Sequence, residues 1–108
     1  MAEFAGAMLT DTTNWGCGFD FKVEPPEPSP FLAVEVKGLR ERSGRIQMTD
    51  VEFEVADALR ERYFLVLVRN FAEAPFHNLI RDPTRSALKF TKVERKETRL
   101  SWTTNILA

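Results

Sequence analysis

Two acidic residues and a lysine stand at spacings that strand geometry can bring together. Asp20 lies in residues 19–23 (FDFKV), and Glu35 and Lys37 lie in residues 33–37 (AVEVK). Apolar and polar residues alternate in both segments, which is the pattern of half-buried strands. Because successive side chains of a strand point to opposite faces, Glu35 and Lys37 share one face.

Pairing of the two segments brings the second acidic residue to the same surface. We expect Phe19 and Phe21 to face the core, which leaves Asp20 and Lys22 on the opposite face. A Glu-x-Lys pattern on a strand is common by chance, and such pairs usually form solvated surfaces. The segment Gly18-Phe19-Asp20-Phe21 upstream and a capped helix downstream favour a functional interpretation.

These residue types suit metal-assisted hydrolysis of a phosphodiester. Asp20 and Glu35 offer hard oxygen ligands for Mg²⁺ or Mn²⁺, and the Val36 carbonyl can complete the shell. The metal would stabilise the charge that develops on the phosphodiester and lower the pKa of its bound water. Lys37 would orient or deprotonate the attacking water and stabilise the transition state.

Further polar residues are weaker candidates for the same site. Glu52 can reach the metal or a water beside it, although its place in a capping box already explains it. Gln47 is a further candidate to contact a water or a ligand beside the metal. A basic cluster near the site can contact flanking phosphates or can be a solvated loop; it comprises Arg40, Arg42 and Arg45.

The remaining reactive or aromatic residues are assigned structural roles. His77 lacks the companion ligands that zinc needs, and Cys17 has no base beside it in the sequence. Trp15 and Trp102 are interpreted as core residues rather than base-stacking platforms.

The elements that must position the site alternate between short strands and one helix. Residues 2–8 are predicted to form about two helical turns, and residues 10–18 a loop rich in turn formers. Four prolines between residues 25 and 30 predict a stiff extended connection. It leads into a strand over residues 31–37, and a charged turn separates this from a short strand over residues 45–48.

The second half contains the helix and the central strand. Thr49 and Glu52 form a capping box that opens a helix. Residues 63–68 (YFLVLV) are typical of a strand covered on both faces, and residues 76–80 of an edge strand. One or two short strands are expected in the last 25 residues. The order β-β-(β)-α-β-β predicts an α/β (α+β) fold, a small mixed sheet with a packed helix.

Composition sets the class of protein. With 108 residues, the chain is interpreted as a single domain over residues 1–108, either cut from a larger protein or a reduced form whose activity depends on a partner. No apolar run is long enough to cross a bilayer, and the single cysteine excludes an internal disulfide framework, so a cytoplasmic location is expected. The 15 basic and 16 acidic residues give no basic surplus, so a fused domain or partner subunit is expected to supply much of any DNA affinity. A homodimer is compatible with these features.

The motifs in this order resemble the NO VEIN C-terminal domain family. The residues that carry the resemblance are Gly18 to Phe21, Ala33 to Gly38, Met48 to Glu52, Tyr63 to Val68, and Asp82-Pro83. The family is regarded as a branch of the PD-(D/E)XK nuclease-like superfamily. The resemblance therefore implies a restriction-endonuclease-like core, a metal held by Asp20 and Glu35, and a catalytic Lys37. Family members normally have a longer helix and a strand ahead of the first motif, for which residues 1–15 are short.

Three functions remain open from the sequence. The first is an Mg²⁺-dependent DNA endonuclease domain of a restriction or defence system. The second is a non-catalytic module with the nuclease fold that binds nucleic acid or a protein partner. The third is a structural subunit that completes a larger enzyme.

Overall fold

The structure is a computed structural model, and it describes residues 6–26, 29–94 and 100–107. The elements in chain order are β1 (Met8–Asp11), β2 (Phe21–Glu24), β3 (Leu32–Gly38), β4 (Gly44–Thr49), α1 (Asp50–Leu59), η2 (Arg60–Arg62), β5 (Tyr63–Arg69), β6 (Phe76–Arg81), η3 (Pro83–Arg85), β7 (Thr91–Glu94) and β8 (Leu100–Ile106). Within this part of the chain, no helix is long and apolar enough to cross a membrane.

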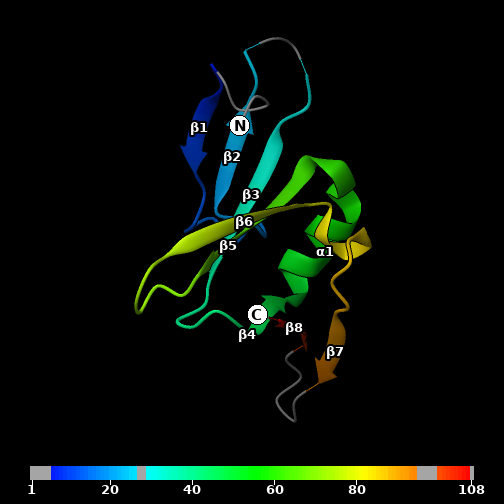
Figure 1. The fold of residues 1–108 in the computed structure, drawn as a ribbon. Helices are drawn as coiled ribbons and strands as arrows, with labels where there is room; N and C mark the ends of the chain where they lie inside the picture. Colours follow the sequence, from blue (N-terminus) through cyan, green and yellow to red (C-terminus); the bar gives the residue numbers. More distant parts are fainter. Residues whose placement is uncertain (1–5, 27–28, 95–99, 108) are drawn as a thin grey trace.

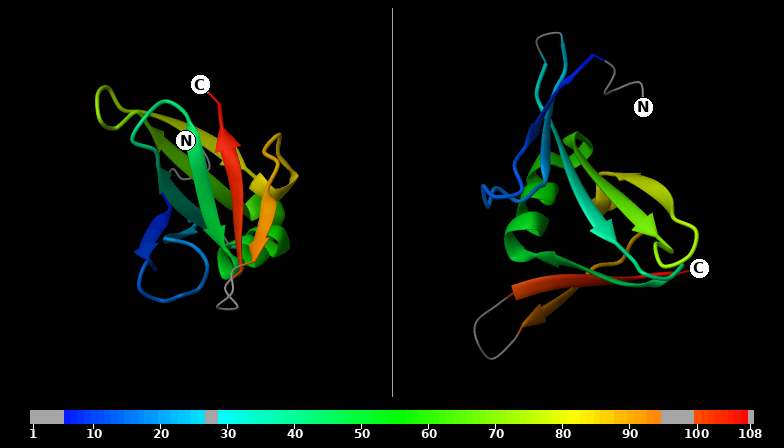
Figure 2. Two further views of the ribbon diagram at one scale, coloured as in Figure 1. Left: turned by 90° about the horizontal axis from the view of Figure 1, so that it is seen from below. Right: turned by 90° about the vertical axis from the view of Figure 1, so that its left-hand side faces the viewer.

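Two sheets, one α-helix and two short 3₁₀ helices make up the part of the chain that the structure describes (Figure 1). The five-stranded sheet has the order β1-β2-β3-β5-β6, and the three-stranded sheet has the order β4-β8-β7. In the larger sheet β3 and β5 run parallel, while its other neighbours run antiparallel. Figure 2 shows α1 and the smaller sheet on the same side of the larger sheet.

The core lies mainly between the two sheets and under the helix. Leu65 and Leu67 of β5 pack with Ile46 and Ile106 of the smaller sheet. Under α1, Ala56 packs with a second group of buried residues that comprises Ala33, Met48 and Tyr63. The face of β3 that carries Glu35 and Lys37 is therefore the interior face, because Ala33 belongs to it and successive side chains alternate.

The helix begins as its capping box predicts. The Thr49 hydroxyl accepts from the Glu52 amide at 3.2 Å, and the Glu52 carboxylate accepts from the Thr49 amide at 2.9 Å. Each bond satisfies a backbone N–H that the first turn of a helix leaves unpaired. The N-terminus of α1 is thereby fixed at the end of β4, next to β3.

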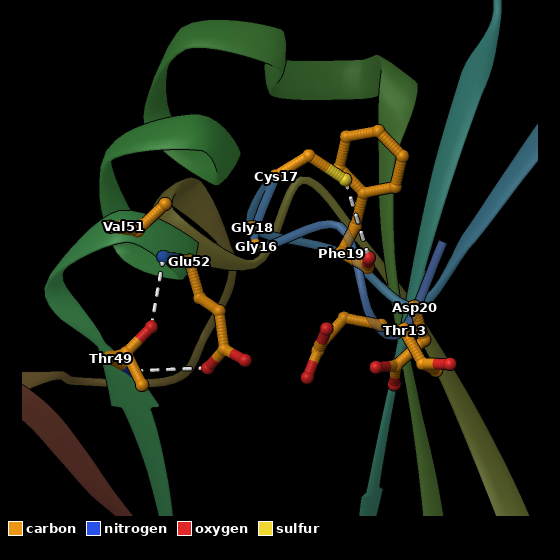
Figure 3. Close-up of a pocket in the computed structure, with 10 residues that line it drawn as sticks. Thr13, Gly16, Cys17, Gly18, Phe19, Asp20, Thr49, Val51 and Glu52 are labelled. Atoms are coloured by element: carbon orange, nitrogen blue, oxygen red, sulfur yellow. Dashed lines mark hydrogen bonds between the residues drawn. The ribbon is translucent and has the colours of Figure 1, made fainter. Parts of the chain in front are cut away.

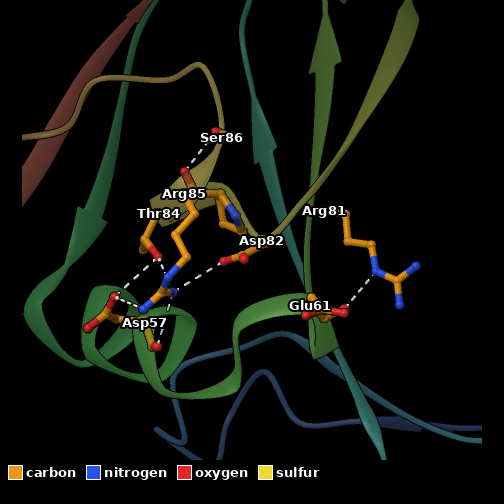
Figure 4. A network of polar contacts seen from close by, with 8 residues as sticks. Asp57, Glu61, Arg81, Asp82, Thr84, Arg85 and Ser86 are labelled. Carbon is orange, nitrogen blue, oxygen red and sulfur yellow. Dashed lines mark hydrogen bonds and ion pairs between the residues drawn. The ribbon is translucent and has the colours of Figure 1, made fainter.

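A polar network fixes the other end of the helix (Figure 4). Arg85 of η3 pairs with Asp57 of α1 at 3.2 Å and with Asp82 at 3.4 Å. The Thr84 hydroxyl also donates to Asp57, and Arg81 donates to the Glu61 carbonyl at 2.8 Å. The helix is thus held against the larger sheet at both of its ends.

Several sequence predictions are confirmed and others are corrected. β3, β4, β5, β6 and the two C-terminal strands lie where they were expected, and β6 is an edge strand. The expected mixed sheet with a packed helix is confirmed in the five-stranded sheet, but β4, β7 and β8 form a separate antiparallel sheet that was not expected. Along the chain, β1 precedes the predicted order β-β-(β)-α-β-β. The two expected C-terminal strands, β7 and β8, follow it.

The N-terminal segment also differs from its prediction. Of the helix expected over residues 2–8, Gly6 lies in a turn and β1 begins at Met8, while residues 1–5 lie outside the described part. β1 pairs with β2 in the register Met8 opposite Glu24, so these backbone groups are satisfied by a neighbouring strand. Two isolated helical turns would lack such support.

Candidate metal-dependent hydrolytic site

Asp20, Glu35 and Lys37 lie together at the junction of β2, β3 and the N-terminus of α1. Asp20 immediately precedes β2, and its Oδ2 accepts from the Val36 amide at 2.8 Å. Lys37 Nζ lies 3.2 Å from Glu35 Oε2 and 2.8 Å from Glu52 Oε1. Sequence reasoning therefore identified side chains that the fold brings together.

One step of that reasoning is corrected by the structure. Phe19 and Phe21 were expected to face the same core, but Phe19 packs under α1 and Phe21 packs on the other face of the sheet with Val23 and Val34. The first pair of the β2–β3 ladder is Phe21 opposite Val34, so Phe19 lies before the strand, where alternation does not apply.

The backbone of the 12–20 loop, the segment Thr12 to Asp20 between β1 and β2, positions Asp20. The Thr12 amide donates to the Asp20 carbonyl at 2.8 Å, and the Thr12 hydroxyl donates to the Phe19 carbonyl at 2.7 Å. The buried Tyr63 hydroxyl donates to the Gly18 carbonyl at 2.8 Å. These bonds hold the loop against β5 and so fix where the Asp20 side chain begins.

Gly18 is required for this close approach. Its φ is +92°, and a Cβ added there would lie 2.8 Å from Val55 Cγ2 and 3.1 Å from the Val51 carbonyl oxygen. L-residues other than glycine rarely adopt this backbone region. The glycine lets the loop lie directly on the first turns of α1, beside the carboxylates.

A pocket of about 370 Å³ opens between the loop and the helix (Figure 3). Figure 3 shows Thr49 and Glu52 on one side of it and Thr13 and Asp20 on the other. Glu35 also lines it, and its other wall residues are small or apolar: Gly16, Cys17, Gly18, Phe19 and Val51. Carboxylates from three elements therefore border one hollow.

Glu35 is the most deeply buried carboxylate of the group. The residue is 2% exposed, and among the described residues its Oε1 has no hydrogen-bond partner. Burial and the negative charge of Glu52 raise the pKa of Glu35 to about 8, although Lys37 acts in the opposite direction. The metal-free carboxyl is therefore mainly protonated at neutral pH, because ionisation of a buried oxygen without a donor is costly unless a cation neutralises it.

The charged partner of Glu35 is held in its cationic form. Burial disfavours the charge of Lys37, but the hydrogen bond to Glu52 and the two neighbouring carboxylates outweigh it and raise the Lys37 pKa. Burial likewise opposes ionisation of Glu52, but the bonds from Lys37 and Thr49 lower its pKa. Glu52 thus caps the helix and anchors Lys37 with one carboxylate.

The donor set fits a hard divalent cation that keeps several waters. In a strand, the N–H and C=O of one residue point to the same side, so the Val36 carbonyl points toward Asp20, as its amide does. Asp20, Glu35 and this carbonyl are oxygen donors of the kind Mg²⁺ and Mn²⁺ prefer. Among the described residues, no group of three or more His, Cys, Asp or Glu side chains could hold an ion by itself.

The other candidates lie away from the pocket. Gln47 and Arg45 are exposed on the face of β4 opposite the buried Ile46 and Met48, and neither lines the pocket. Arg40 and Arg42 belong to the exposed loop after β3, where the Arg42 guanidinium lies 5.6 Å from the ring centroid of Phe76. Their role in phosphate contact stays a prediction.

A comparison with family models identifies the family of the chain. A model described as Protein NO VEIN, C-terminal, matches residues 3–80. The chain belongs to this family. All three predicted site residues, and Glu52 as well, lie in the matched segment of this NO VEIN C-terminal domain, whereas β7 and β8 follow it. No curated protein matches the chain, and no solved structure matches it.

Proposed function

We propose that this NO VEIN C-terminal domain is a metal-dependent DNA endonuclease of the PD-(D/E)XK type. The single observation that carries the proposal is the buried Glu35 carboxylate, whose unpartnered Oε1 lies with Asp20 and Lys37 beside a pocket. A purely structural Glu–Lys pair would be expected at a solvated surface. Here the pair is placed inside the domain, where its desolvation is costly.

Asp20 and Glu35 are the residues that would hold the cation, together with the Val36 carbonyl. When bound, Mg²⁺ or Mn²⁺ stabilises charge on a phosphodiester and lowers the pKa of a coordinated water. The Val36 amide restrains the Asp20 carboxylate through its 2.8 Å bond. The restraint leaves Asp20 Oδ1 as the oxygen available for a ligand.

Lys37 contributes a fixed positive charge. Its Nζ lies between two carboxylates, at 3.2 Å and 2.8 Å, which favour the charged form and restrict the position of the amine. In that form it orients the attacking water and stabilises the negative charge of the transition state. Glu52 acts through Lys37, as a positioning residue.

The test is DNA cleavage in Mn²⁺ or Mg²⁺ by the wild type and by Lys37→Ala. We expect a loss of at least about a hundredfold, the usual scale for removal of one preorganised charge at a transition state. Lys89→Ala is the matched control, because Lys89 is exposed and lies outside this pocket. Cleavage that survives Lys37→Ala undiminished would exclude the proposal, and RNA of the same sequence tests the choice of DNA.

A second candidate is a non-catalytic module that keeps the same fold. It is favoured by the engagement of Lys37 with both Glu35 and Glu52, a closed ion-pair group that needs no ligand to neutralise Lys37. This alternative predicts no Mn²⁺ binding by calorimetry and normal folding of Asp20→Ala. A Mn²⁺ binding heat that disappears in Asp20→Ala would exclude it.

A further inference from the structure

Trp15 is exposed beside the pocket, contrary to the expectation that it lies in the core. Its side chain is 63% exposed. Thr13, two residues before it in the chain, and Gly16, directly after it, both line the pocket. Trp102 shows the contrast, because its ring stacks on Phe53 at 3.8 Å under the helix, as expected for a core residue.

The backbone that carries Trp15 is fixed by its own hydrogen bonds. The Trp15 amide donates to the Thr12 carbonyl at 2.9 Å. Asp11 Oδ1 accepts from the Thr13 amide at 2.9 Å and from the Thr13 hydroxyl at 2.6 Å. An aromatic side chain on a preorganised loop loses little conformational entropy when a ligand covers it.

The charge balance of the domain favours an uncharged contact with nucleic acid. The chain has 15 basic and 16 acidic residues, and Asp20, Glu35 and Glu52 border the pocket itself. Carboxylates repel the phosphate backbone, so the protein surface near the site cannot rely on a basic patch. Base stacking on an aromatic ring supplies affinity without charge and tolerates any sequence.

We propose that Trp15 is a stacking platform for a nucleobase of the strand whose phosphate lies at Asp20 and Glu35, an inference that rests on the proposed function. The pocket separates these carboxylates from a wall of small or neutral residues, which include Gly16 and Cys17. That wall is suited to the nucleoside next to the phosphate. The 12–20 loop thus contributes a metal ligand and a base contact from one segment.

The test compares Trp15→Ala and Trp15→Phe with the wild type for binding of a labelled single-stranded DNA oligonucleotide in Ca²⁺. We expect Trp15→Ala to weaken binding about tenfold or more, and Trp15→Phe to retain most of it. An oligonucleotide with abasic positions should bind the wild type and Trp15→Ala alike. The matched control is Phe71→Ala, because Phe71 is 50% exposed but lies on the loop after β5.

Two results would overturn the inference. One is equal affinity of the wild type and Trp15→Ala for the oligonucleotide, which includes the case in which neither binds. The other is a dimer of the wild type, seen by sedimentation, that Trp15→Ala converts to a monomer with unchanged DNA binding, since the ring would then contact a second copy.

Cleavage measured in parallel separates this inference from the proposed function. If Trp15→Ala cleaves DNA with the KM of the wild type, the stacking role is contradicted and the nuclease proposal is unaffected. Trp15-dependent binding by a wild type that cleaves nothing supports the stacking role and contradicts catalysis.

Discussion

Replacement of Glu35 by glutamine is expected to stabilise the metal-free protein while it removes one ligand of the proposed ion site. Burial, first of all, raises the pKa of this carboxyl from 4.5 to about 8. Each unit corresponds to about 1.4 kcal/mol, so ionisation of Glu35 costs the folded state roughly 5 kcal/mol. Glutamine avoids that cost, but imperfect hydrogen bonding of its buried amide destabilises the folded state by about 1–2 kcal/mol. The expected net gain at pH 9 is roughly 3 kcal/mol.

The sign of the pH dependence follows from proton linkage. Between pH 4.5 and pH 8 the folded protein retains a proton on Glu35 that the unfolded chain has lost. The stability of the wild type therefore falls as pH rises through this window, and the contribution is fully lost above pH 8. Near pH 5 the carboxyl is neutral in the folded state, so wild type and Glu35→Gln should agree within about 1 kcal/mol.

The assay is urea denaturation in EDTA at pH 5, 7 and 9, followed by tryptophan fluorescence. Glu54→Gln is the matched control, because Glu54 is an exposed carboxylate on α1. Equal or lower stability of Glu35→Gln at pH 9, or a gain of the same size at pH 5, would refute the account of Glu35 as a desolvated anion. Addition of Mn²⁺ should stabilise the wild type and leave Glu35→Gln unchanged.

Three further substitutions test how the site is positioned. Thr49→Ala removes the N-cap and should lower the free energy of unfolding by about 1 kcal/mol in urea titrations; an unchanged midpoint would contradict the capping role. Gly18→Ala forces a Cβ to 2.8 Å from Val55 and a side chain into a positive-φ position, so a loss of about 2–4 kcal/mol is expected by thermal denaturation. Tyr63→Phe leaves the Gly18 carbonyl without its donor, so the free energy of unfolding should fall by about 1–2 kcal/mol and Mn²⁺ binding should weaken by calorimetry. Wild-type values for both would show that the Tyr63 hydroxyl does not position the 12–20 loop.

The parts of the fold that depend on local patterns were predictable from sequence. The alternation in residues 33–37 placed Glu35 and Lys37 on one face, and the capping box placed the start of α1 at Thr49. The continuous apolar run over residues 63–68 identified the buried β5. Each of these signals is set by neighbours in the chain, so no tertiary information was needed.

The parts that depend on long-range pairing were not predictable. β1 (Met8–Asp11) is a strand because β2 lies beside it, although the sequence predicted the end of a short helix and the start of a loop there. The division into two sheets depends on β4 pairing with β8, more than 50 residues later. Trp15 is 63% exposed, whereas its residue type alone favoured burial.

The pairing of β4 with β8 extends the fold beyond the region of family similarity. The family match stops at residue 80, but in the described part of the chain β4 finds its ladder partner in β8 (Leu100–Ile106). A chain trimmed to the matched segment would leave the backbone groups of β4 unpaired, together with Met48 and Ile46, which the smaller sheet helps to bury. Thr49 and the Glu52 that anchors Lys37 follow directly from that strand. The smallest unit that folds stably is therefore expected to be longer than the region of family similarity.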